Sequence, residues 1–316
     1  MKTTIYEILK NYKVKKYNFY NNKNLLNNYV NKIYIINLVD NIFRRNYIIL
    51  LMKKYQISFT LIVVDRITDY TYNLLNIYNN LTKGEVGCTL SHLWCINDII
   101  NNEYKNAIIF EDDIILHKDF NQLIINTLSR NNYDFLLLGA CDFSFKKINC
   151  DFVENNLYKP HKNSERIYGA HAIYYSLDGA KKMFEYKINE FSFFDKNFLY
   201  MFNKFDKSSF ICYPNLVVSD ITTSNLQHKY HLLSYQEIRY YTNCFIDFNF
   251  NNYNFIYLDL LIKNKNLQIK SNDTYDTYIN KILYNHFSKN EDRITIYNRL
   301  SKNFFTIEDI KNIIHN

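Results

Sequence analysis

The chain has 316 residues, of which 47% are hydrophobic and 17% aromatic, and its formal net charge is +7. This length allows one large or two ordinary domains with a substantial core. No run reaches about 18 uninterrupted apolar residues and residues 1–16 are polar and basic, so the sequence predicts neither a membrane span nor a signal peptide. The expected compartment is the cytoplasm, where the six cysteines, which form no CxxC pair, stay free thiols.

The charge is unevenly distributed along the chain. Residues 1–30 hold six lysines against one acid, whereas residues 31–228 hold 21 bases and 21 acids. We therefore expect residues 1–30 to form a solvated basic arm ahead of an electroneutral body, and we expect no specific nucleic-acid partner. The alternative is that the arm has a function of its own and binds a polyanion or an anionic surface. Amphipathic patterns predict a mainly helical C-terminal extension over residues 229–316, which binds an acceptor, pairs two subunits as a homodimer or covers the sheet.

The first elements form a parallel strand–helix–strand unit. Ile33–Leu38 and Phe59–Val64 read as buried strands, and a helix capped by Asp40 or Asn41 runs between them from Ile42 to about Gln56. In such units ligands bind at the carboxyl ends of the strands. Asn37, Arg44 and Asp65 are expected near that edge.

A buried helix is predicted over residues 89–101, because apolar side chains occupy more than one of its faces. Ser91 and His92 are neighbours on this helix and point about 100° apart, which argues against a nucleophile and its base. We expect His92 to be a hydrogen-bonded structural group, or to orient a site residue by a hydrogen bond without contacting the ligand itself.

Three adjacent acids, Glu111, Asp112 and Asp113, follow the apolar run Ala107–Phe110. This run reads as a buried strand, so the acids come where the strand leaves the core. Adjacent carboxylates repel one another unless a cation lies among them, and hard oxygen ligands suit Mg²⁺ or Mn²⁺, which also binds nucleotide phosphates.

Further α/β elements follow in alternation. Asp195 stands behind three phenylalanines at the start of a helical run, where it serves as a cap or as a catalytic base. His171 is a core histidine or a ligand contact. All five glycines lie between residues 84 and 180, which places the most demanding backbone geometry there. The expected elements are helix 119–129, strand 134–139, an irregular loop over 141–165, strand 168–175, helix 177–186 and helix 195–205.

Several short motifs occur in one order along about 190 residues. They are Ile36–Leu38 with Arg44 and Arg45, Leu81–Cys88 running into Leu90–His92, Phe110–Asp113, Gly179–Lys181, Asp195, Tyr213 with Pro214, and Ser219 with Asp220. Together they resemble glycosyltransferase family 25, which contains lipooligosaccharide and procollagen galactosyltransferases. The LTKGE segment and the Tyr213–Ser224 segment are more similar to the procollagen branch.

The resemblance implies a GT-A-type nucleotide-binding sheet flanked by helices over residues 31–228. It also implies an enzyme that uses Mn²⁺ or Mg²⁺ to transfer a hexose from a UDP-hexose to a glycan or protein acceptor, with inversion at the anomeric carbon. Glu111 and Asp113 are two apart on an extended strand and so on one side of it, and we expect them at the metal and the ribose; a turn at the strand end would reverse this choice. Asp195 is the expected base and Asp220 the second choice. Contacts to the nucleotide sugar are expected from Asn37, Arg44, Glu85, His92 and Asp112.

Two other classes of function compete with this interpretation. A metal-dependent phosphatase or nuclease also uses clustered acids, but two-metal sites draw on more scattered carboxylates and usually on histidines. A nucleotide-sugar-binding protein without catalytic activity is the other alternative. Metal-dependent release of UDP from a UDP-sugar distinguishes a transferase from both.

Overall fold

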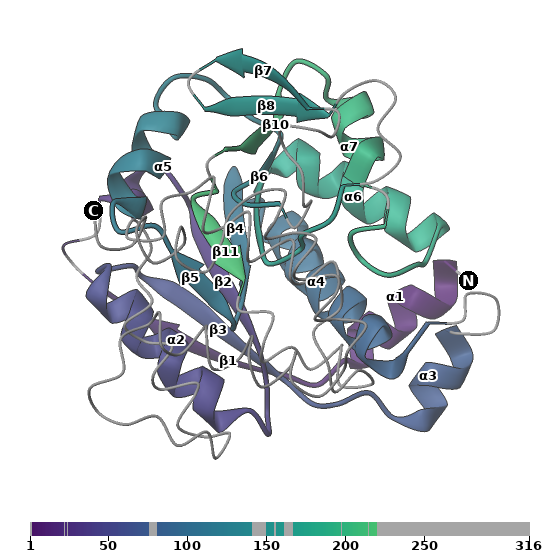
Figure 1. The fold of residues 1–316 in the computed structure, drawn as a ribbon. Helices are drawn as coiled ribbons and strands as arrows, with labels where there is room; N and C mark the ends of the chain where they lie inside the picture. The colour runs from purple at the N-terminus through teal and green to yellow at the C-terminus, as the bar shows by residue number, and fades with distance from the viewer. Residues whose placement is uncertain are drawn as a thin grey trace, which may run out of the picture.

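The strand–helix–strand unit lies inside a mixed sheet in the computed structural model, which describes residues 2–219 apart from 22, 24, 76–80, 141–149, 155, 161–166, 197 and 214. Strand β2 (Lys32–Leu38) runs parallel to β3 (Phe59–Val64) on one side and to β4 (Asn106–Glu111) on the other. The remaining strands of this sheet are β1 (Val14–Phe19), β6 (Phe135–Leu137), β7 (Cys150–Glu154), β8 (Leu157–Pro160), β9 (Ala172–Ser176) and β10 (Ser209–Cys212). Among the described residues the order is β1-β3-β2-β4-β9-β6-β10-β8-β7 (Figure 1).

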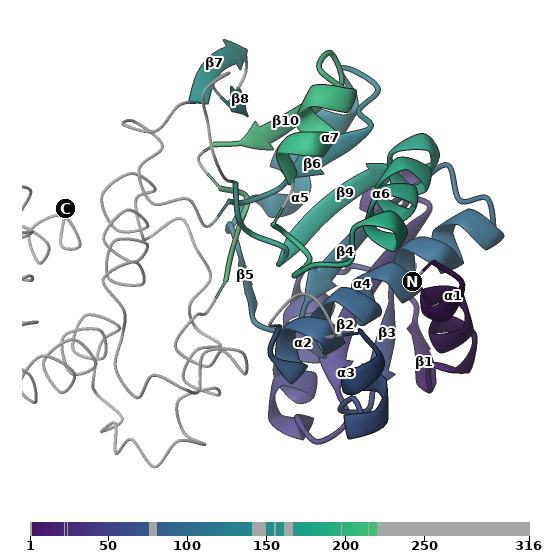
Figure 2. The ribbon, with the colours of Figure 1, turned by 90° about the vertical axis from the view of Figure 1, so that its right-hand side faces the viewer.

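Helices cover both faces of the sheet. Helix α2 (Ile42–Lys54) and helix α5 (Phe120–Leu128) lie on one face, and α4 (Lys83–Asn101) and α6 (Leu177–Asn189) lie on the other (Figures 1 and 2). The chain passes from β3 across β2 to reach β4, so a right-handed crossover places α4 on the face opposite α2. The α/β class predicted from the sequence is therefore confirmed.

Helix α4 begins six residues before the predicted start. Thr82 caps it: the Thr82 hydroxyl accepts a hydrogen bond from the amide of Glu85, and the Glu85 carboxylate accepts one from the amide of Thr82. This reciprocal pair satisfies two amides that the first turn leaves without a helical partner. The T-x-x-E signature was present in the sequence, and it would have located the start of the helix.

The N-terminal residues belong to the sheet, which corrects the expectation of a solvated arm over residues 1–30. Helix α1 (Lys2–Asn11) buries Ile5 and Leu9, and β1 pairs antiparallel with β3 along its whole length. The pattern misled because both lysines of β1 are exposed on an edge strand, where Lys16 also pairs with Asp98 of α4 over 2.7 Å. Charged side chains on an exposed edge discourage pairing with another chain.

The second half of the sheet is antiparallel at β9, which pairs with β4 and β6. Two parts of the predicted irregular loop, residues 150–154 and 157–160, instead form the antiparallel pair β7 and β8. Residues 141–149, 155 and 161–166 lie outside the described residues. Gly139 is tightly packed, since a Cβ there would clash with the Val217 carbonyl, and Gly179 is restricted in the same way by the Asp134 carbonyl. These two glycines are required by close backbone approach.

A small two-stranded sheet extends the acidic end of β4. It pairs β5 (Ile114–Leu116) antiparallel with β11 (Val217–Ser219). The remaining elements are η1 (Leu26–Asn28), α3 (Asp69–Leu75) and α7 (Phe198–Lys204). The predicted C-terminal extension, residues 229–316, lies outside the described residues, and the proposed domain division remains a prediction.

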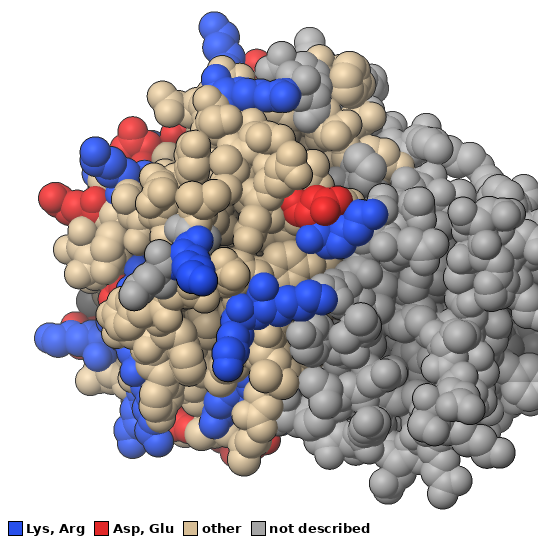
Figure 3. All heavy atoms as spheres, turned by 90° about the vertical axis from the view of Figure 1, so that its left-hand side faces the viewer, with Lys and Arg blue, Asp and Glu red and all other residues tan. Residues whose placement is uncertain are grey.

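Within the described ranges no helix combines the length and the apolarity needed to cross a bilayer. On the face shown in Figure 3, lysine and arginine side chains are scattered over the described part, with uncharged and acidic residues between them.

Candidate functional site

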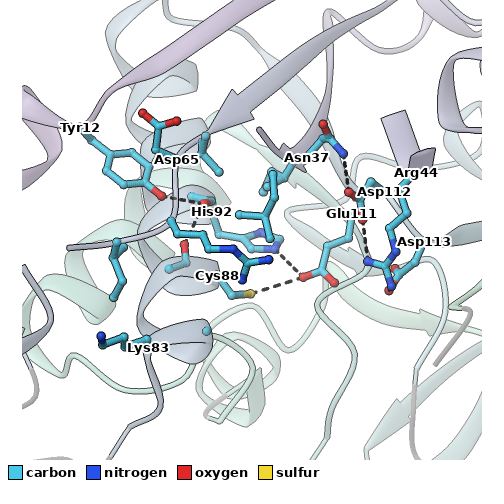
Figure 4. A pocket seen from close by; sticks show the side chains of 18 residues that line it. Tyr12, Asn37, Arg44, Asp65, Lys83, Cys88, His92, Glu111, Asp112 and Asp113 are labelled. Atoms are coloured by element: carbon cyan, nitrogen blue, oxygen red, sulfur yellow. Dashed lines mark hydrogen bonds and ion pairs between the residues drawn. The ribbon is translucent and has the colours of Figure 1, made fainter. Parts of the chain in front are cut away.

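A cavity of about 320 Å³ opens where the parallel strands β2, β3 and β4 end. Its wall includes the last residues of these strands, the first turns of α4 and one residue that follows α1. The lining residues are Tyr12, Ile36, Asn37, Leu38, Arg44, Val64, Asp65, Arg66, Ile67, Lys83, Gly84, Gly87, Cys88, Ser91, His92, Glu111, Asp112 and Asp113 (Figure 4). The pairing register of β2 with its two neighbours explains why these side chains meet, because Leu38 is paired with Val64 of β3 and Ile36 with Glu111 of β4. Parallel strands thus bring their polar ends to one edge.

Asp112 is held by two neighbours from the first βα unit. Arg44 Nη1 donates to Asp112 Oδ1 over 2.8 Å, and Asn37 Nδ2 donates to Asp112 Oδ2 over 2.6 Å. Burial raises the pKa of the Asp112 carboxyl, and the charge of Arg44 opposes that rise. Arg45 in turn donates from Nε to Asn37 Oδ1 over 2.8 Å, which fixes the orientation of the amide. Asn37, Arg44 and Asp112, all predicted site residues, therefore form one buried network.

Glu111 faces α4 instead. Its Oε1 accepts a hydrogen bond from the Cys88 thiol at 3.4 Å and lies 3.1 Å from His92 Nε2. Burial opposes ionisation of Glu111, but the hydrogen bond and charge of His92 outweigh it and lower the pKa of this carboxyl. Burial, aided by the charge of Glu111, raises the pKa of the Cys88 thiol well above its ordinary value. The His92 ring also stacks on Phe194, with centroids 4.2 Å apart.

The expected convergence of Glu111 and Asp113 by strand alternation is not what the chain does. Strand β4 ends at Glu111, and residues 112–113 form a turn before β5. In Figure 4 the Glu111 carboxylate points toward His92 and Cys88, whereas Asp113 lies beside Arg44, with Oδ2 3.3 Å from Nη2. Both carboxylates nevertheless line the same cavity.

The residues present fit a Mg²⁺ or Mn²⁺ ion. Such ions take one or two protein carboxylates and complete their shell with water and substrate phosphate oxygens. Glu111 and Asp113 supply hard oxygen atoms on the cavity wall, and the Glu111 side chain is 26% exposed there. The metal assignment itself remains a prediction.

Asp195 lies in a turn just before α7 rather than at the helix start. Its Oδ2 accepts a hydrogen bond from the amide of Gly169, which has a φ of 128° that favours glycine. Burial is the main cause that raises the pKa of Asp195; the charge of Glu111 adds to the rise and that of Lys187 opposes it. Asp195 therefore lies within electrostatic range of the acidic cavity, although it is not one of the lining residues.

Two further residues singled out from the sequence lie outside the cavity wall, and a third is not described. Glu85 caps α4 with Thr82 and does not line the cavity. His171 is buried, with Nε2 3.2 Å from the Val217 carbonyl, so it packs in the core. Asp220 is outside the described residues.

Tyr12 and Lys83 line the cavity without having been singled out from the sequence. Tyr12 follows α1, and its hydroxyl lies 3.1 Å from the hydroxyl of Ser91 on α4. No local pattern predicts this contact, since the two residues are 79 apart in the chain. Lys83 was detectable, because the capping pair of Thr82 and Glu85 marks Lys83 as the first residue of a helix.

Comparison with known proteins places these residues in a family. The sequence profile described as "Glycosyltransferase family 25 (LPS biosynthesis protein)" matches residues 30–191. Procollagen galactosyltransferase 1 of Danio rerio is 27% identical over 110 residues, which are 33% of this chain and 17% of that protein. The match thus spans less than a fifth of the relative's length.

One solved structure shows a weaker similarity. It is titled "Crystal structure of a glycosyltransferase involved in the glycosylation of the major capsid of PBCV-1", with 12% identity and a TM-score of 0.37 over 67% of this chain and 98% of that chain. A score this low supports no assignment by itself. The profile match covers half of the chain and includes β2, α4 and the acids that follow β4. The chain belongs to glycosyltransferase family 25.

Proposed function

We propose that this family member transfers a hexose, galactose or glucose, from a UDP-sugar to a hydroxyl group of a glycan or protein, with inversion and with Mn²⁺ or Mg²⁺. The observation that carries the proposal is the cavity at the strand ends, where Glu111, Asp112 and Asp113 meet Asn37 and Arg44. Ligands of open α/β sheets bind at this edge.

The wall offers groups suited to each part of a nucleotide diphosphate. Asp65, exposed directly after β3, offers a carboxylate that can accept hydrogen bonds from ribose hydroxyls. Arg66 and Lys83 form exposed ion pairs with Asp40 and Asp69, respectively. Exposed pairs contribute little stability, so both cations are available to exchange a carboxylate for a phosphate.

The start of α4 supports phosphate binding as well. Gly84 and Gly87 lie on the cavity wall in the first turns of this 19-residue helix. Free amides and the helix dipole favour an anion at a helix N-terminus. A Cβ at Gly87 would meet only Ile67 at 3.7 Å, so the wall there leaves space for a ligand.

Glu111 and Asp113 are the residues that would hold the divalent ion, which supplies charge neutralisation for the departing diphosphate when bound. Arg44 keeps Asp112 and Asp113 in place by pairing with both carboxylates. Asn37 holds the second oxygen of Asp112. The network fixes the acids before substrate arrives, which is the preorganisation that charge stabilisation needs.

Asp195 is the proposed base that takes the proton of the acceptor hydroxyl. Its raised pKa makes the carboxylate a better proton acceptor than an ordinary aspartate, as general base catalysis near neutral pH requires. The amide of Gly169 and the turn before α7 orient it. Asp220 remains the second choice.

A panel of nucleotide sugars, with detection of the released nucleoside diphosphate, tests the proposal. We expect UDP release from UDP-galactose or UDP-glucose in Mn²⁺ and its loss in EDTA. Asp113→Asn should abolish turnover, while Asp119→Asn, an exposed acid outside the cavity, should not. Full turnover of Asp113→Asn in EDTA would refute the metal assignment. Tight UDP binding without turnover on any acceptor would instead identify a binding protein.

A further inference from the structure

Three side chains on the wall of the cavity direct sulfur, nitrogen and oxygen atoms toward one another. Cys88 and His92 are four residues apart on α4 and therefore share a face of the helix. Glu111 meets them from the end of β4, and the ligand atoms of all three lie within 4.8 Å of one another. Within the described part of the chain this is the one group of three or more such side chains that meets this spacing.

The spacing matches the edges of a metal coordination tetrahedron. With Zn–S near 2.3 Å and Zn–N or Zn–O near 2.0 Å, two ligand atoms in a tetrahedral zinc site are about 3.3–3.5 Å apart. Cys88 Sγ is 3.4 Å from Glu111 Oε1, and His92 Nε2 is 3.1 Å from the same oxygen. The ligand atoms of Cys88 and His92 lie within 4.8 Å of each other, so an ion among the three atoms requires adjustment along this edge alone.

The donor types select a different class of ion from the one proposed for sugar transfer. Thiolate and imidazole ligands suit Zn²⁺, whereas Mg²⁺ and Mn²⁺ prefer carboxylate and water. We propose that Cys88, His92 and Glu111 form a three-ligand site for Zn²⁺ or a similar borderline-soft ion, with its fourth position open to the cavity. All three line the cavity, and the 26% exposure of Glu111 provides the entry path. Three protein ligands with an open fourth position distinguish an exchangeable site from a closed structural one.

Occupancy of this site has a consequence that rests on the proposed transferase function. Glu111 would contact both Zn²⁺ here and Mn²⁺ or Mg²⁺ during transfer, and two dications held by one carboxylate repel each other at close range. Zn²⁺ therefore competes with the activating ion and inhibits turnover. Binding of Zn²⁺ itself does not depend on the transferase proposal.

Cobalt, a spectroscopic substitute for zinc, tests the site directly in the full chain. We expect Co²⁺ to produce intense visible bands of a four-coordinate ion and a near-ultraviolet thiolate-to-metal band. Cys88→Ser should remove the thiolate band, and His92→Gln should weaken Co²⁺ binding by about 10-fold or more. Cys95→Ala, which removes another buried thiol of the same helix, should leave the spectrum unchanged. A thiolate band that persists in Cys88→Ser, or no such band in the wild type, overturns the site.

A second measurement needs no variant and covers the case in which Cys88→Ser fails to fold. Alkylation of the native wild-type protein, read by peptide mass spectrometry, should be at least about 10-fold slower at Cys88 with Zn²⁺ present. Equal rates with and without Zn²⁺ refute the proposal. A protein that shows the cobalt spectrum but no transferase activity would disprove the proposed function and leave the zinc site standing.

Discussion

Arg44 and Asp112 form a buried ion pair, in which Nη1 donates to Oδ1 over 2.8 Å and each side chain is 7% exposed. The pair joins the start of α2 to the turn after β4, which are 68 residues apart in the chain. Because Arg44 also reaches Asp113, one guanidinium organises two of the three acids. This dependence makes the arginine a structural requirement of the acidic cluster.

Arg44→Met should therefore destabilise the fold strongly. Breaking a buried pair by removing one partner costs about 3–5 kcal/mol, because the other charge stays buried without compensation. Urea unfolding measures the change in the free energy of unfolding. Arg45→Met is the matched control, since Arg45 binds Asn37 and backbone carbonyls rather than a carboxylate. An equal loss in both variants would contradict a special role for the Arg44–Asp112 pair.

The N-terminal segment should be required for stability. Deleting residues 1–20 removes α1 and β1, exposes the edge of β3 and takes Tyr12 from the cavity wall. The single change Leu9→Ala should cost about 2–5 kcal/mol, because Leu9 is 4% exposed in the core. Thermal and urea unfolding check both. Leu25→Ala, at a side chain 66% exposed, should change stability by less than about 0.5 kcal/mol. A truncated protein as stable as the full chain would refute this role.

Asp195→Asn should lower turnover by about 100-fold or more, because the amide keeps the size of the carboxylate but cannot accept a proton. Binding of UDP should change little, since Asp195 does not line the cavity. Calorimetry of UDP binding beside single-turnover rates separates the two effects. Loss of UDP binding with an unchanged chemical rate would make Asp195 a nucleotide-sugar contact and leave Asp220 as the candidate base.

Lys187 should give the protein an unusual pH dependence. Its side chain is fully buried, donates to Ser192 Oγ and the Phe193 carbonyl, and has a pKa lowered by burial to about 8. Between that value and the unfolded pKa of about 10.4, the unfolded chain binds a proton that the folded chain releases. Stability from this group therefore rises with pH across that window and is lost as pH falls.

Comparison with Lys187→Met isolates the effect, because groups shared by both proteins cancel in the difference. The stability of the wild type relative to the variant should increase by about 1 kcal/mol from pH 7 to pH 9, as two-state linkage gives for these pKa values. Urea unfolding at the two pH values measures it. A difference that is constant or falls with pH would show that Lys187 is not destabilised as an ammonium ion.

The sequence determined the central elements and the acidic cluster, because these depend on local patterns. Ile33–Leu38 and Phe59–Val64 are mainly apolar runs, each with a single polar residue, and such runs are buried on both faces of a sheet. Glu111, Asp112 and Asp113 were identifiable because three acids directly after a buried strand cannot follow it into the core. The α/β class and the edge that carries the cavity followed from the same runs.

Only the tertiary structure decided which side chains meet. The lysine-rich N-terminus reads as a solvated arm, yet β1 pairs with β3, since a strand at the edge of a sheet tolerates exposed charged side chains. A turn at Asp112 separated Glu111 from Asp113 and directed them to different partners, His92 with Cys88 and Arg44. Local periodicity shows which face of each element is buried. The long-range contacts depend on the order and register of the strands, and these cannot be read from local sequence patterns.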